Sequence, residues 1–198
     1  MEQKNLQVKN KLEDYILTID DESGFLVSDS IIKVCKKYPE KFGQGAIVGN
    51  NNSTIDKKIR DTLIWVLGSN IDDMISMHWG QYISYIFRRS LKFYRQYTKE
   101  NHDVILTDIS ILKYGKNGHY KVHHDHHRKF PRTLSFIMFL NDDYEGGDLK
   151  FHFPDEKNIH SINKKRGRIV IFPSNFLYKH TVEPVKEGTR YSIVAWML

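Results

Sequence analysis

The sequence has little cysteine and no long apolar run, and each shortage removes a class of protein. Cys35 is the single cysteine among 198 residues, which excludes an intramolecular disulfide and a zinc site built on several cysteines. No apolar stretch approaches the roughly 20 residues that span a bilayer. The first residues also lack the apolar core of a signal peptide. From these shortages we expect a soluble, cytoplasmic protein with no membrane partner.

The charge balance is only mildly basic. The chain carries 30 Lys and Arg against 24 Asp and Glu, a formal net charge of +6. This excess permits a nucleic-acid partner but is weak evidence for one. Apolar residues make up 40% and charged residues 27%, as in ordinary globular proteins, and the 11 Tyr and 11 Phe suit a β-rich core. The length suits one domain, residues 1–198, and no pattern indicates an oligomeric state.

The first half of the chain, residues 1–103, predicts a helical support region. Its patterns indicate a short strand at 15–20, which a break at Asp-Glu-Ser-Gly ends, and then a helix capped by Ser28 or Ser30. A loop over 40–56 follows, with a brief strand at 46–48. A long amphipathic helix, capped by Asn70, is expected from about Ile71 to Tyr97.

The second half, residues 104–198, predicts a β core. Runs of β-branched and aromatic residues alternate with turn signals, and no helical pattern separates them. This spacing is typical of a sandwich, a barrel or a jelly roll. The predicted strands are residues 104–114, 120–125, 133–140, 148–153, 168–172, 178–182 and 190–197.

A histidine-rich run at residues 123–127 is the strongest candidate for chemistry. On a strand, His123 and Asp125 present an imidazole and a carboxylate to one side. His124 and His126 share the opposite side, so Asp125 favours His123 or His127 as its partner. A His-x-Asp pair is a weak signal by itself, since surface histidines in a polar loop look the same.

Two downstream residues strengthen this signal. His180 adds a second imidazole from another strand, and two His with one carboxylate suit an open, redox-active metal site. Arg190 begins the last apolar strand, where a guanidinium is costly unless it meets an anion. That anion is either a ligand carboxylate, which we favour, or a protein acid such as Glu183.

Residues 104–198 resemble the prolyl 4-hydroxylase-like branch of the 2-oxoglutarate- and Fe(II)-dependent oxygenases. The resemblance implies a mainly β (α+β) fold, with a double-stranded β-helix (jelly roll) core supported by a helical layer. The residues that carry it are Tyr114, Gly118, Tyr120, His123, Asp125, Arg132, Leu134, Ser135, Leu140, Asn141, Glu145, Gly146, Gly147, Leu149, Gly167, Arg168, Ile171, Phe172, Pro173, His180, Arg190 and Trp196.

The resemblance also implies roles for individual residues. Fe(II) is expected on His123, Asp125 and His180. Arg190 is expected to hold the distal carboxylate of 2-oxoglutarate, assisted by Tyr114 and Ser135. Arg132, Tyr120 and Trp196 are expected near the substrate mouth, although the aromatic pair also suits an ordinary core and Arg132 a surface charge.

The implied reaction is the hydroxylation of a C–H bond with Fe(II), 2-oxoglutarate and O2, and with ascorbate as a supporting reductant. The branch suggests a prolyl residue in a protein or peptide as the substrate. A free amino acid or another small molecule is an alternative. A nucleic-acid demethylase is disfavoured, because such enzymes end in Arg-x-Asn-x-Thr-x-Arg where this chain has Arg190-Tyr191-Ser192-Ile193. A non-catalytic metal-binding jelly roll is the remaining alternative.

Overall fold

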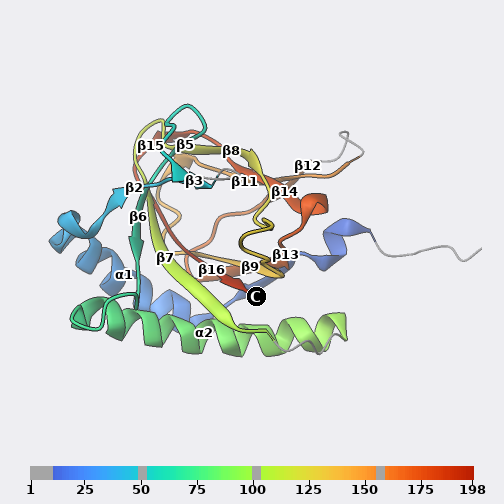
Figure 1. The fold of residues 1–198 in the computed structure, drawn as a ribbon, viewed down its shortest axis with the longest axis horizontal. Helices are drawn as coiled ribbons and strands as arrows, with labels where there is room; N and C mark the ends of the chain where they lie inside the picture. Colours follow the sequence, from blue (N-terminus) through green and yellow to red (C-terminus); the bar gives the residue numbers. More distant parts are fainter. Residues whose placement is uncertain (1–10, 49–52, 100–103, 155–158) are drawn as a thin grey trace, which may run out of the picture.

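Two antiparallel β-sheets face each other, and two helices cover the outer face of the larger sheet (Figure 1). This architecture comes from a computed structural model that describes residues 11–48, 53–99, 104–154 and 159–198. The helices are α1 (Glu22–Lys37) and α2 (Met74–Thr98). Short 3₁₀ turns occur at Leu12–Tyr15, Pro39–Lys41 and Phe176–Tyr178. The prediction of a mainly β fold with N-terminal helices is confirmed.

The strands form a major and a minor sheet. In spatial order the major sheet contains β1 (Leu17–Asp20), β13 (Arg168–Pro173), β9 (Leu134–Phe139), β16 (Arg190–Met197), β7 (Leu106–Tyr114), β6 (Leu63–Val66) and β2 (Gly43–Gln44). The minor sheet contains β12 (Ile159–Ile162), β11 (Leu149–His152), β14 (Lys179–Val182), β8 (His119–His123) and β5 (Arg60–Asp61). Two small ribbons pair β3 (Ile47–Val48) with β4 (Ser53–Thr54) and β10 (Glu145–Gly146) with β15 (Val185–Glu187).

Successive side chains along the strands of the major sheet point to opposite faces, and both faces are apolar. One face packs on α1 and α2 around Phe87, Phe136 and Ile193. The opposite face meets the minor sheet around Phe139 and Phe151. Successive side chains of β9 therefore enter different cores, as the period of two requires.

The start of α1 differs from the prediction. The helix begins at Glu22, and Asp21 is its N-cap, accepting a hydrogen bond from the Gly24 amide at 2.7 Å. Ser28 lies one turn inside, where its buried hydroxyl donates to the Gly24 carbonyl at 2.6 Å. Gly24 lies inside the helix at a close contact that needs a glycine, because a Cβ there would lie only 3.2 Å from the Gly167 carbonyl oxygen. Close packing against β13 thus overrides the helix-breaking tendency of the Ser-Gly pair.

The start of α2 also differs. Its N-cap is Asp73, whose carboxylate accepts from the Ser76 amide at 3.1 Å, and the Lys41 ammonium holds the same carboxylate at 2.9 Å. Asn70, the predicted cap, instead accepts from the Asp72 amide at 3.0 Å in a local turn. The contact with Lys41 is long-range and leaves no trace in the helical pattern.

The N-terminal half supplies strands as well as helices. β1 pairs with β13, β6 with β7, and β5 with β8, so this half extends both sheets. Strands β5, β6 and β12 were not predicted, although the run Leu63–Val66 of β6 carries a recognisable strand signal. Neither helix combines the length and apolar character that a membrane crossing needs, and the described part of the chain holds no other candidate.

Candidate metal centre and cosubstrate pocket

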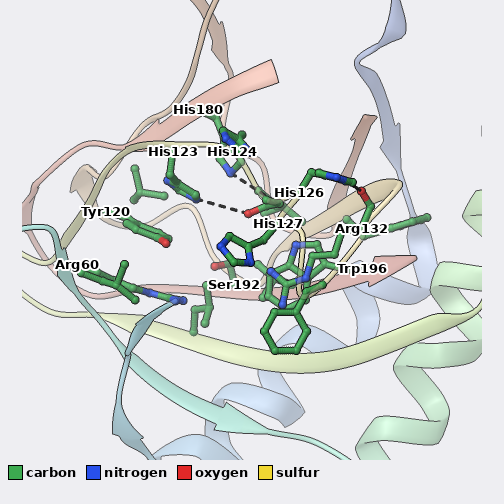
Figure 2. A pocket seen from close by; sticks show the side chains of 18 of the residues that line it. Arg60, Tyr120, His123, His124, His126, His127, Arg132, His180, Ser192 and Trp196 are labelled. Atoms are coloured by element: carbon green, nitrogen blue, oxygen red, sulfur yellow. Dashed lines mark hydrogen bonds and ion pairs between the residues drawn. The ribbon is translucent and has the colours of Figure 1, made fainter. Parts of the chain in front are cut away.

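Three ligand atoms converge between the two sheets. His123 ends β8 and pairs directly with His180 of β14 in the register of the minor sheet. The Asp125 carboxylate lies 3.6 Å from Nε2 of His123 and 3.7 Å from Nε2 of His180 (Figure 2). All three donor atoms lie within 4.8 Å of one another, a spacing that one metal ion can bridge. Among the described residues, no other cluster of this kind occurs.

Hydrogen bonds orient both imidazoles. Nδ1 of His123 lies 2.7 Å from the Lys121 carbonyl, and Nδ1 of His180 lies 3.1 Å from the Tyr178 carbonyl. A carbonyl only accepts, so Nδ1 carries the proton and Nε2 keeps its lone pair for a metal. The Tyr120 ring stacks on His123 at 3.5 Å between centroids, which fixes the plane of that imidazole.

Asp125 reaches the site by a route that the sequence did not predict. The strand ends at His123, so alternation does not place Asp125 beside it. Instead the amides of Asp125 and His126 both donate to the Ser174 carbonyl, at 3.2 and 2.8 Å, and turn the chain back over the site. The prediction that residues 120–125 form one strand is wrong at its end.

Ser135 lies beside Asp125. Its hydroxyl donates to the Asp125 carboxylate at 2.6 Å and lies 2.7 Å from the Ser174 hydroxyl. Ser135 pairs with Trp196 in the register of β9 and β16, whereas Arg190 lies at the other end of β16. The described contacts of the Ser135 hydroxyl are thus with a candidate metal ligand and with Ser174, and none of them is with Arg190.

Electrostatics favours the protonation states that bind a metal. Burial lowers the pKa of His123 to about 3, aided by the neighbouring His180. Burial alone raises the pKa of Asp125, but His180, His123 and the Ser135 hydrogen bond outweigh it and hold the pKa at about 2. At neutral pH the site therefore presents a neutral His123 beside a carboxylate, as metal ligation requires.

A Ser135→Ala variant tests this support. We expect its affinity for Fe(II) to fall about 10- to 100-fold, the usual cost of losing a group that orients a ligand. Saturating Fe(II) should restore the complex, because the three donors remain. Metal titration of Ser135→Ala beside Ser161→Ala, which changes an exposed serine, checks this. Equal metal affinity in the two variants would contradict the assigned role.

Arg190 is a buried cation facing the same cavity. Its side chain is 1% exposed and lies between the rings of Tyr114 and Phe139, with centroids 5.0 and 5.3 Å from the guanidinium carbon. Nη1 donates to the Ser192 hydroxyl at 2.8 Å, but Nε has no hydrogen-bond partner among the described residues.

No described carboxylate forms an ion pair with Arg190. Glu183, the alternative partner, pairs with the Lys150 ammonium at 2.7 Å instead. The buried Tyr144 hydroxyl lies near the Arg190 guanidinium and interacts with it. Arg190 thus offers an anion in the cavity an unused Nε donor and a desolvated positive charge.

Ser192 and Tyr144 were not predicted as site residues. Ser192 follows Arg190 by two positions on one strand, so alternation alone could have placed it on the same side. Tyr144 lies in the turn before the Gly146-Gly147 pair, and only the tertiary structure brings it to Arg190. A Cβ on Gly147 would lie 3.0 Å from the Tyr144 ring and 3.2 Å from Arg190, so a glycine there leaves room for both side chains.

The metal-ligand candidates and Arg190 line one cavity of about 330 Å³. Arg132, Tyr120 and Trp196 also line it, as the resemblance implies, and Arg132 lies over the Trp196 ring at 3.6 Å. His124, His126 and His127 line the wall but do not join the three-donor cluster. Arg60 of β5 enters from the N-terminal half and was not predicted (Figure 2).

The fold and the site together define a class. Two facing antiparallel sheets hold two imidazoles and one carboxylate around an open position, with a buried arginine in the same cavity. This arrangement is typical of non-haem Fe(II) oxygenases on a double-stranded β-helix.

The family follows from sequence comparison. Residues 109–198 match the model of the 2OG-Fe(II) oxygenase superfamily, so the β core of this chain is similar to that superfamily. The name of the superfamily specifies Fe(II) and 2-oxoglutarate. The three-donor cluster fits Fe(II), and the buried Arg190, whose Nε has no hydrogen-bond partner among the described residues, fits 2-oxoglutarate.

Named relatives match over part of their length. A PKHD-type hydroxylase of Crocosphaera subtropica is 34% identical over 103 residues, 48% of this chain and 45% of the relative. Human prolyl 3-hydroxylase 2 is 36% identical over 66 residues, 33% of this chain and 9% of the relative. The chain thus spans less than half the length of these curated relatives.

Solved structures confirm the jelly-roll fold. A Trichoplax adhaerens prolyl hydroxylase in complex with a hypoxia-inducible-factor peptide fragment superposes with a TM-score of 0.75 at 22% identity, covering 93% of this chain and 84% of that one. A Pseudomonas putida prolyl-4-hydroxylase gives a TM-score of 0.66 at 19% identity, covering 92% of this chain and 91% of that one. At these identities the likeness shows the fold alone.

Proposed function

We propose that this protein is a 2-oxoglutarate- and Fe(II)-dependent dioxygenase that hydroxylates a C–H bond, in a prolyl residue of a protein or peptide. The observation that carries the proposal is one cavity that contains both a three-donor face and a buried cation that forms no ion pair with any described carboxylate. A structural metal site does not need that cation, whereas a dicarboxylate cosubstrate does.

His123, Asp125 and His180 are the proposed ligands, and three protein donors would leave coordination positions for other ligands. Fe(II) there supplies the chemistry that activates O2. The balanced reaction converts 2-oxoglutarate, O2 and a C–H group into succinate, CO2 and a hydroxyl group. One oxygen atom enters succinate and the other enters the substrate.

The protein's own contribution is binding and orientation. Arg190 receives the distal carboxylate of 2-oxoglutarate, with Ser192 fixing the guanidinium and Tyr114 forming the wall beside it. Burial strengthens this pairing, because little water competes inside the cavity. Ser135 donates a hydrogen bond to the Asp125 carboxylate and would hold it in place as a metal ligand.

The names of the relatives and neighbours support a prolyl substrate. The curated relatives include PKHD-type hydroxylases and a prolyl 3-hydroxylase, and the Trichoplax neighbour is described with a peptide fragment. In this chain the aromatic walls Tyr120 and Trp196 suit a pyrrolidine ring. Peptide binding and cytoplasmic activity stay predictions from the sequence.

Anaerobic titration with Fe(II) and 2-oxoglutarate tests the proposal. The purified protein should develop the weak visible charge-transfer band of an iron–keto-acid chelate. After O2 is admitted, mass spectrometry of candidate prolyl peptides should show a gain of one oxygen that depends on 2-oxoglutarate. If the band is absent in protein that circular dichroism shows to be folded, the proposal is wrong.

A further inference from the structure

Two arginines flank the cavity besides the one assigned to 2-oxoglutarate. Arg60 and Tyr120 lie on one side, and Arg132 and Trp196 lie on the other (Figure 2). Nothing in the proposed reaction so far uses a positive charge at either place.

The Tyr120 ring lies between Arg60 and the candidate metal ligand His123. Its guanidinium carbon lies 4.5 Å from the centroid of Tyr120, and the Tyr120 ring stacks on His123. Nη1 donates to the Ala46 carbonyl at 3.0 Å, which fixes the side chain. Nε is buried and has no hydrogen-bond partner among the described residues.

Arg132 has a matching arrangement on the opposite side. Its guanidinium carbon lies 3.6 Å over the Trp196 ring, and the Trp196 side chain interacts with the Asp125 carboxylate. Nε of Arg132 is also buried and without a partner among the described residues. Its ion pair with Asp108 is long, at 3.7 Å, and the Asp108 side chain is 54% exposed, so this contact offsets little of the charge.

The charge balance of the cavity indicates an anionic ligand. The lining contains three arginines and one carboxylate, Asp125. Asp125 faces the metal position and Arg190 is assigned to 2-oxoglutarate. Among the described residues, Arg60 then has no carboxylate partner and Arg132 has only the long contact with the exposed Asp108. A peptide carbonyl would satisfy one donor but neutralise no charge, whereas a carboxylate accepts from both guanidinium groups.

We propose that the substrate carries a carboxylate beside the C–H bond to be hydroxylated, and that Arg60 and Arg132 bind this carboxylate from opposite sides. This inference rests on the proposed function and specifies its substrate class. The carboxylate belongs either to an acidic residue next to the target in a peptide or to the target's own free carboxyl group. Both sources present the same group to the two arginines.

Matched pairs of probes separate these sources. N-acetylproline and N-acetylprolinamide differ only in a free carboxyl group, and acetyl-Pro-Glu-amide and acetyl-Pro-Gln-amide differ only in an acidic side chain. Binding is measured by calorimetry under anaerobic conditions, with Fe(II) and saturating 2-oxoglutarate, so that Arg190 is already occupied. We expect the acidic member of at least one pair to bind about tenfold tighter or more, the scale of one charge-assisted hydrogen bond.

Variants assign the preference to the two arginines. The double variant Arg60→Gln/Arg132→Gln should lose the preference for the acidic probe. Arg88→Gln, which removes the same charge from an exposed position on α2, should keep it. Persistence of the preference in the double variant would overturn the assignment.

Comparing the two members of each probe pair in the wild-type protein tests the inference without any variant. Equal affinity within both pairs, in protein that forms the chelate band, would overturn the inference and leave the proposed function standing. Failure to form the band would overturn the proposed function and the inference with it.

Discussion

Replacing Asp125 with alanine should abolish 2-oxoglutarate turnover while the fold stays intact. Asp125 is the single carboxylate in the three-donor cluster, and its charge offsets part of the charge of a metal held otherwise by neutral imidazoles. We expect Asp125→Ala to lose the chelate band and at least about 100-fold in turnover, more than the loss of a group that only orients a ligand. Succinate formation and the visible spectrum measure both effects.

The fold of this variant should persist for a local reason. Ser135 still has the Ser174 hydroxyl as a partner when the carboxylate is gone, at 2.7 Å. The backbone turn at Asp125 is held by amide bonds to the Ser174 carbonyl, which the substitution does not remove. Asp72→Ala, at an exposed position before α2, is the matched control and should keep full turnover. Full turnover in Asp125→Ala would show that the proposed ligands are wrong.

Replacing Arg190 with methionine should separate cosubstrate binding from protein stability. The affinity for 2-oxoglutarate should fall by about 2–5 kcal/mol, roughly 30-fold or more, because a buried charge pair is lost. The ligand-free protein should unfold at the same temperature or higher, since a desolvated cation without an anion is replaced by an apolar side chain. Isothermal titration and thermal unfolding measure the two changes independently.

A keto acid without the distal carboxylate sharpens this experiment. Wild-type protein should bind 2-oxoglutarate much more tightly than 2-oxobutyrate, whereas Arg190→Met should bind the two with similar affinity. Arg88→Met, at an exposed position, should behave as wild type in both titrations. If Arg190→Met keeps the preference for 2-oxoglutarate, the distal carboxylate binds elsewhere and the assignment of Arg190 is wrong.

Much of the β core could be predicted because its signals are local. β9 and β16 are nearly continuous runs of aromatic, β-branched and other apolar residues, and turn residues separate the strands. His123, Asp125 and Arg190 are recognisable for a related reason. Burying charged or metal-binding side chains among apolar strands costs free energy unless a ligand compensates for it. The errors lie at ends and edges, where Asp73 replaced Asn70 as a cap and the strand stopped at His123.

The sequence by itself therefore determined the class of chemistry, through His123, Asp125, His180 and Arg190. The tertiary structure decided how these residues meet and what surrounds them. Pairing of β14 with β8 brings His180 against His123, Ser135 and Ser174 from other strands orient Asp125, and β5 carries Arg60 into the cavity. Each is a contact between segments far apart in the chain, so it depends on which strands become neighbours in the fold and cannot be seen in the residues of either segment alone.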